Sequence, residues 1–82
     1  MTEAAQVIKG IIAEKLRVSP QYVDEDCTLH ELGLDSLGAA EVVLAVEQRF
    51  SVALDMSVIK DSVQPDTKLS ELLALMSNMV ST

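Results

Sequence analysis

The stretch LGLDSL, residues Leu32–Leu37, lies where a loop ends and a strongly apolar helix begins. Asp35 has the side chain of a helix N-cap, because a carboxylate there can accept hydrogen bonds from the unpaired N–H groups of the first turn. Ser36 then takes the first helical position, where backbone donors and the positive end of the helix dipole favour a phosphate attached to its Oγ. Caps of this composition are common, so the stretch gains its meaning only from the surrounding sequence.

The helix that follows is expected to run from Ser36 to about Phe50 and to have two apolar faces. At 100° per residue, one group gathers on an arc that suits a core: Ala39, Val42, Val43, Val46 and Phe50. A second group, Leu37, Ala40 and Leu44, lies on another arc beside Ser36. A small bundle rarely buries both faces of one helix, so we predict a partly exposed contact surface at Leu37 and Leu44. The alternative is that both groups belong to the core.

A long acidic connection, residues 24–35, precedes this helix. Thr28 and Glu31 have the spacing of a capping box, which predicts one helical turn over 29–32 closed by Gly33. Three leucines in the connection can anchor it to the core: Leu29, Leu32 and Leu34. We therefore expect a structured loop, because an unanchored connection of this length is unusual in a compact domain.

Helical spacing predicts the remaining elements. A first helix is expected from a cap at Thr2 to about Arg17, with Gly10 and Ala13 opposite its apolar stripe of Ala4, Val7, Ile8, Ile11, Ile12 and Leu16. Pro20 is expected to begin a single turn, and Asp55 or Ser57 is expected to start a short helix. Thr67 is expected to cap a last helix, whose apolar stripe consists of Leu69, Leu72, Leu73, Met76, Met79 and Val80. The predicted fold is all-α: a small four-helix bundle of three longer helices and one short helix, with a long structured loop between helices 1 and 2, in a single domain over residues 1–82.

The charge of the chain restricts its partners. Its 82 residues include thirteen acids and six bases, a formal net charge of −7, and no Lys or Arg occurs from Val18 to Gln48. Nucleic acids and anionic membrane surfaces are poor partners for such a chain, whereas basic surfaces are steered toward it. The sequence has no apolar run long enough to span a membrane and no leader pattern, so we expect a cytoplasmic monomer.

Two chemical alternatives fit the sequence less well. An enzyme with Ser36 as nucleophile needs a base, but His30 is the only histidine and the G-x-S-x-G motif is absent, so no catalytic residue is predicted. Calcium could be considered because Asp24, Asp26, Thr28 and Asp35 fall at the first, third, fifth and twelfth positions of an EF-hand loop, but Leu29 stands where the turn requires Gly. No specific metal site is predicted, and a divalent-cation-binding or plain helical interaction module remains the alternative function.

The run LGLDSL, followed by Glu41 and the helix end Glu47–Phe50, resembles the acyl carrier protein family, which consists of phosphopantetheine-binding carrier domains. The helix order, acidic balance and length agree over essentially the whole chain. The resemblance implies that Ser36, flanked by Asp35 and Leu37, holds a covalent phosphopantetheine transferred from coenzyme A by a separate phosphopantetheinyl transferase. Acyl groups would be carried as thioesters on the thiol of this arm, and not on the single cysteine, Cys27.

The resemblance also implies partner enzymes. Glu41 and Glu47 would dock basic patches of acyl-transferring, ketosynthase-type or acyl-activating enzymes, with Leu44 as an apolar anchor. The chain departs from the fatty-acid carriers at Gly38, where they have an acid, and at Gln48 and Arg49, where acids are also replaced. A fatty-acid, polyketide or related specialised acyl pathway therefore stays open, and a peptidyl carrier is disfavoured because Leu34 stands where a second Gly is usual.

Overall fold

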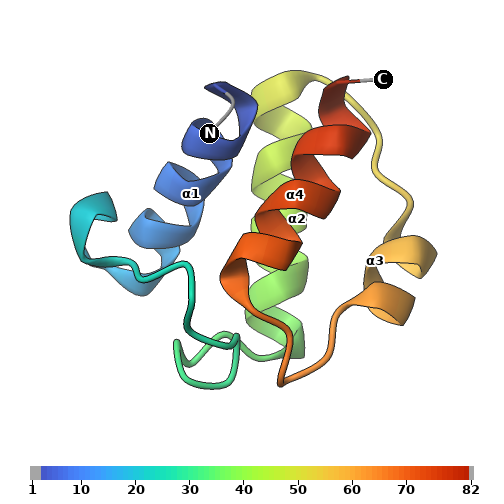
Figure 1. Ribbon diagram of the computed structural model, residues 1–82. Coiled ribbons are helices and arrows are strands. Elements are labelled where there is room, and N and C mark those ends of the chain that lie inside the picture. The colour runs from blue at the N-terminus through green and yellow to red at the C-terminus, as the bar shows by residue number, and fades with distance from the viewer. Residues whose placement is uncertain (1–2, 82) are drawn as a thin grey trace.

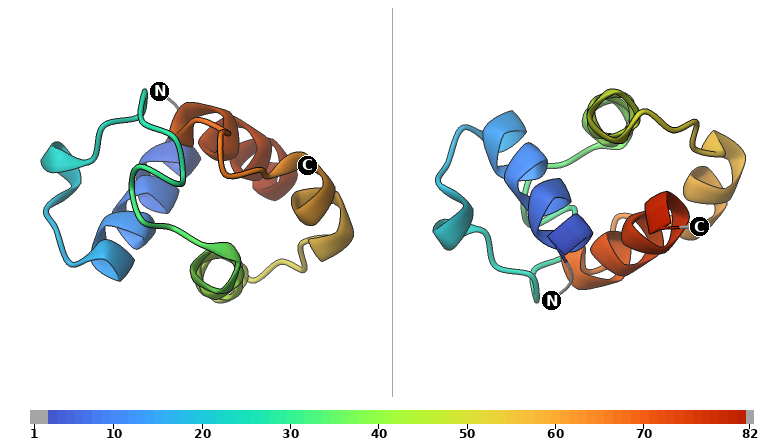
Figure 2. Two further views of the ribbon diagram at one scale, coloured as in Figure 1. Left: turned by 90° about the horizontal axis from the view of Figure 1, so that it is seen from below. Right: turned by 90° about the horizontal axis from the view of Figure 1, so that it is seen from above.

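The computed structural model describes residues 3–81 and confirms an all-helical bundle. Three longer helices and one short helix follow in the order α1 (Glu3–Leu16), α2 (Ser36–Phe50), α3 (Met56–Ser62) and α4 (Leu69–Ser81), with one 3₁₀ turn, η1 (Pro20–Tyr22), after α1. α1, α2 and α4 surround the core, and α3 lies on the side of the bundle away from α1 (Figures 1 and 2). Within the described residues, no helix is long and apolar enough to cross a membrane.

The core is built almost entirely from aliphatic side chains. The predicted core face of α2 is confirmed, since Val42, Val43 and Val46 are buried while Ala39 and Phe50 are half-buried. The prediction for α1 was partly wrong: Ala13 is completely buried, although the sequence pattern placed it on the outer side. The buried face of α1 is wider than one stripe because this helix packs against both α2 and α4. The predicted cap at Thr2 lies outside the described residues.

The long connection between α1 and α2 is structured, as predicted. Thr28 and Glu31 form a reciprocal capping box, in which the Thr28 N–H donates to Glu31 Oε1 (2.8 Å) and the Glu31 N–H donates to Thr28 Oγ1 (3.1 Å). Gly33 ends the turn with a positive φ of 77°, a conformation that glycine adopts without steric cost. Leu29 and Leu34 are buried and Leu32 is half-buried against the core. The loop is therefore fixed where it delivers Asp35 to the start of α2.

The same connection also caps α4, which corrects the prediction for Thr67. Its hydroxyl accepts the N–H of Gln64 (2.9 Å) and so closes the preceding turn, while α4 begins only at Leu69. The first N–H groups of α4 donate instead to the loop, Leu69 to the Cys27 carbonyl (2.9 Å) and Ser70 to the Glu25 carbonyl (3.0 Å). A helix start has unpaired donors that need such acceptors, and here they come from a segment distant in the sequence.

Candidate functional site

Ser36 occupies the first position of α2 and is exposed, as the sequence predicted. Asp35 is the N-cap, and its Oδ1 accepts the N–H of Gly38 at 2.7 Å. Among the described residues, the N–H groups of Ser36 and Leu37 have no hydrogen-bond acceptor. Two free donors at the positive end of a helix suit a phosphate on Ser36 Oγ, so the local geometry fits a phosphodiester at this residue.

Two hollows open beside Ser36. One, of about 340 Å³, lies between the loop before α2 and the segment before α4, and its lining includes the polar residues His30 and Gln64. The other, of about 110 Å³, lies between α2 and α3; apart from Ser36 and Lys60 its lining is apolar, namely Ala39, Ala40, Val43, Met56, Ile59 and Val63. A flexible arm attached to Ser36 thus has a hollow of mixed polar and apolar lining on one side and an apolar groove on the other.

Leu37 and Leu44 of the second apolar group of α2 are exposed, which confirms the predicted surface beside Ser36. Leu37 is 69% exposed and Leu44 is 57% exposed. Ala40, the third member of the group, is half-buried and lines the groove toward α3. We call the pair Leu37 and Leu44 the apolar docking surface. Exposed aliphatic side chains on one helix face, next to acids, have the composition of a protein contact surface.

The two acids that were predicted to dock partner enzymes, Glu41 and Glu47, both interact with other residues of the chain. Glu41 is exposed and forms an ion pair with Lys15 from the last turn of α1. Glu47 is half-buried, and its Oε2 accepts the N–H of Leu54 at 2.7 Å, which fastens the connection between α2 and α3. Only Glu41 is therefore displayed on the surface in the way that the sequence pattern suggested.

Sequence reasoning missed Lys15 and the α3 side of the apolar groove. Lys15 stands near the C-terminal end of α1, where a base is favourable for the helix dipole, so its sequence position has an ordinary explanation. Which acid it meets depends on how α1 packs against α2. The contribution of Met56 and Ile59 to a groove at Ser36 likewise depends on where the α2–α3 connection places the short helix.

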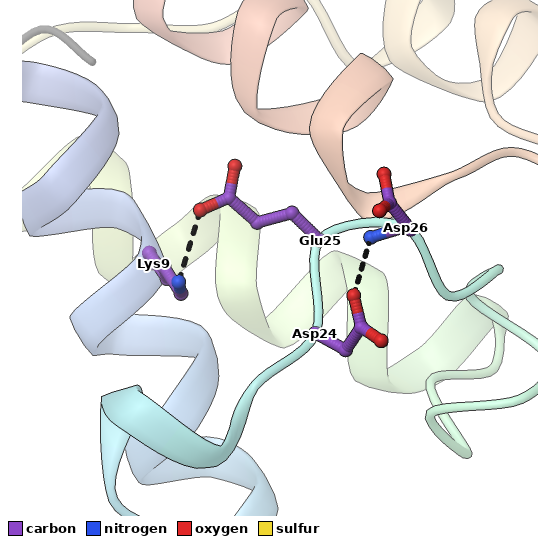
Figure 3. A network of polar contacts seen from close by, with 4 residues as sticks. All are labelled: Lys9, Asp24, Glu25 and Asp26. Carbon is purple, nitrogen blue, oxygen red and sulfur yellow. Dashed lines mark hydrogen bonds and ion pairs between the residues drawn. The ribbon is translucent and has the colours of Figure 1, made fainter.

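Cys27 and the acidic loop give little support to a reactive thiol or to an EF-hand calcium site. Partial burial and, next, the negative charge of Asp24 raise the pKa of the Cys27 thiol, which lowers its reactive thiolate fraction. Asp24 Oδ1 accepts the N–H of Asp26 (2.9 Å), so the proposed first EF-hand ligand is part of a local turn (Figure 3). Over the described range 3–81, no group of three His, Cys, Asp or Glu side chains could hold a metal ion.

Comparisons with known proteins agree with this geometry. The family profile "Phosphopantetheine attachment site" matches residues 6–75. An acyl carrier protein of Zymomonas mobilis subsp. mobilis is 44% identical over 62 residues, which cover 73% of this chain and 80% of that protein. Acyl carrier proteins of Sulfurovum sp. and Wolinella succinogenes are 40% and 38% identical over 48 residues, which cover 57% of this chain and only 64% and 63% of theirs. No solved structure matches the chain.

Proposed function

The chain belongs to the phosphopantetheine-binding acyl carrier protein family, whose carrier domains hold a covalently attached phosphopantetheine, and from this premise we propose that Ser36 is the attachment residue. In this role the chain carries acyl intermediates as thioesters on the thiol of the arm and has no catalytic activity of its own. The observation that carries the proposal is the exposed Ser36 hydroxyl at the start of α2, next to two free N–H groups.

Each residue around Ser36 has a distinct task in this proposal. Asp35 holds the first turn of α2 in place through its bond to the Gly38 N–H, and the free N–H groups of Ser36 and Leu37 hold the phosphodiester. The phosphopantetheinyl transferase supplies the base that activates Ser36 Oγ, so this step requires no base from the chain itself. The bound arm supplies a thiol, and tethering raises the local concentration of its cargo for the next enzyme.

The charge of α2 supports a proposal for the pathway. Gly38, Gln48 and Arg49 leave this helix with fewer acids than the sequence pattern of fatty-acid carriers has, and Glu47 is engaged with the Leu54 N–H. A partner that depends on a dense acidic surface would therefore bind less well than one that uses the apolar docking surface together with Glu41. We propose a specialised acyl pathway, with polyketide synthesis as the leading example, whose partners are acyl-transferring, ketosynthase-type or acyl-activating enzymes.

The attachment can be tested by intact-mass analysis. The full chain is incubated with coenzyme A, Mg²⁺ and a broad-specificity phosphopantetheinyl transferase, and the expected result is a gain of one phosphopantetheine. Ser36→Ala should abolish the gain. Ser57→Ala is the matched control, because Ser57 is also exposed in the first turn of a helix, α3. A mass gain that persists in Ser36→Ala, or no gain in the wild-type chain, would contradict the proposal.

A further inference from the structure

The ion pair between Lys15 and Glu41 joins α1 to α2, and Glu41 lies between Leu37 and Leu44 along α2. The two side chains are 37% and 46% exposed, so both can be reached from solvent. Both also line two hollows between α1 and α2, of about 260 Å³ and about 400 Å³. The pair therefore crosses an open depression, and neither charge is buried in the core.

The smaller of these hollows has the charge pattern of a site for a basic side chain. Asp35 and Glu41 line it together with the exposed Leu37. Gly38 contributes no side chain, and a Cβ there would come within 3.2 Å of both Asp35 Oδ1 and Leu34 Cδ1. A base of the chain itself, Lys15, also lines this hollow and already pairs with Glu41.

Building on the proposed function, we propose that Lys15 is an internal competitor for partner docking: a Lys or Arg of the partner enzyme must displace it from Glu41 and take its place in this hollow. Docking then exchanges one exposed ion pair for another, so Glu41 adds little net affinity while Lys15 is present. The apolar docking surface, Leu37 and Leu44, carries a correspondingly larger share. The partner that fits is an enzyme with an isolated base beside an apolar patch.

Removing Lys15 should free Glu41 and strengthen docking. We expect Lys15→Gln to lower the KM of the carrier for a transferase with a basic docking surface by about two- to fivefold, the range that an exposed ion pair can supply, with little change in kcat. Glu41→Gln should raise this KM modestly. The effect of Lys15→Gln on the KM should disappear when Glu41→Gln is also present, because the double variant has no carboxylate at position 41 that the loss of Lys15 could make available to the partner.

Lys9→Gln provides the matched control. Lys9 also belongs to α1 and also pairs with an acid, Glu25 (2.9 Å), but this pair lies at the long loop (Figure 3). Both substitutions change the net charge of the chain by the same amount, so a general charge effect would lower the KM in both variants. Thermal unfolding followed by circular dichroism verifies that every variant is folded.

The outcomes separate the inference from the proposed function. An unchanged KM in Lys15→Gln, an equal decrease in Lys9→Gln, or a decrease that persists in the Glu41→Gln background would overturn the role of Lys15 while Ser36 is still modified. If no variant, including the wild-type chain, gains mass at Ser36, the proposed function fails and the inference fails with it. A selective decrease in Lys15→Gln that depends on Glu41 supports both.

Discussion

At the scale of the residue, Glu31 illustrates how one side chain can fix a loop. Its carboxylate accepts the Thr28 N–H, and its own N–H donates to the Thr28 hydroxyl. The hydrogen bond from the Thr28 backbone, followed by the hydrogen bond with its side chain, lowers the pKa of Glu31 below its ordinary value. The folded state therefore favours the charged carboxylate, and this contribution to stability depends on pH.

We expect Glu31→Gln to reduce the free energy of unfolding at pH 7 but not in acid. A lowered pKa contributes stability above the unfolded-state value of about 4.3, and this contribution is lost as the pH falls through the folded-state pKa. Urea unfolding of both proteins at several pH values from 7 to about 3 measures the difference. A difference between wild type and Glu31→Gln that stays constant over this range would contradict the assignment.

At the scale of the element, α1 and α2 use glycine differently. Gly10 lies in the middle of α1, and a Cβ there would meet nothing within 4 Å. Gly38 lies in the first turn of α2, where a Cβ would press on the buried Leu34 and on the capping carboxylate of Asp35. Glycine at position 10 therefore only lowers the helix propensity of α1. Glycine at position 38 instead leaves room for the Asp35 cap of α2.

Alanine substitutions should separate these two cases. Gly10→Ala is expected to raise the free energy of unfolding by up to about 1 kcal/mol, the difference in helix propensity, which corresponds to a melting temperature higher by about 4–8 °C in a domain of this size. Gly38→Ala should gain clearly less or lose stability. Thermal unfolding of the two variants checks this, and an equal gain in both would rule out crowding at Gly38.

At the scale of the whole molecule, leucines serve two different purposes. Leu73 of α4 is 2% exposed and belongs to the core shared by the helices, whereas Leu44 of α2 is among the exposed aliphatic side chains. A small domain has a net stability of only about 5–15 kcal/mol. The division of aliphatic residues between core and surface therefore determines which of them can change without loss of the fold.

The same substitution at the two positions should have opposite consequences. Leu73→Ala is expected to cost about 2–5 kcal/mol of stability, because it leaves a cavity in a packed core. Leu44→Ala should change stability by no more than about 0.5 kcal/mol but raise the KM for phosphopantetheinyl transfer. Denaturant unfolding and transfer kinetics measure the two effects. A large loss of stability in Leu44→Ala would show that Leu44 is part of the core.

Local signals predicted much of the fold and the surroundings of Ser36. The Asp35 cap, the capping box of Thr28 and Glu31, and the turn at Gly33 each depend on residues a few positions apart, so spacing alone identifies them. Burial on α2 followed from its helical period. The burial of Ala13 on α1 did not follow from the helical period. The period gives the direction of the buried face of a helix, whereas the number of neighbouring helices decides how wide that face is.

The sequence by itself determined the position of Ser36 at a helix start and the exposure of Leu37 and Leu44 beside it, because helix period and capping act within one element. Only the tertiary structure decided that Thr67 leaves the start of α4 to the carbonyls of Cys27 and Glu25, and that Lys15 meets Glu41. The physical reason is the same in both cases. These contacts join segments far apart in the chain, and their partners are set by how the helices and the loop pack together.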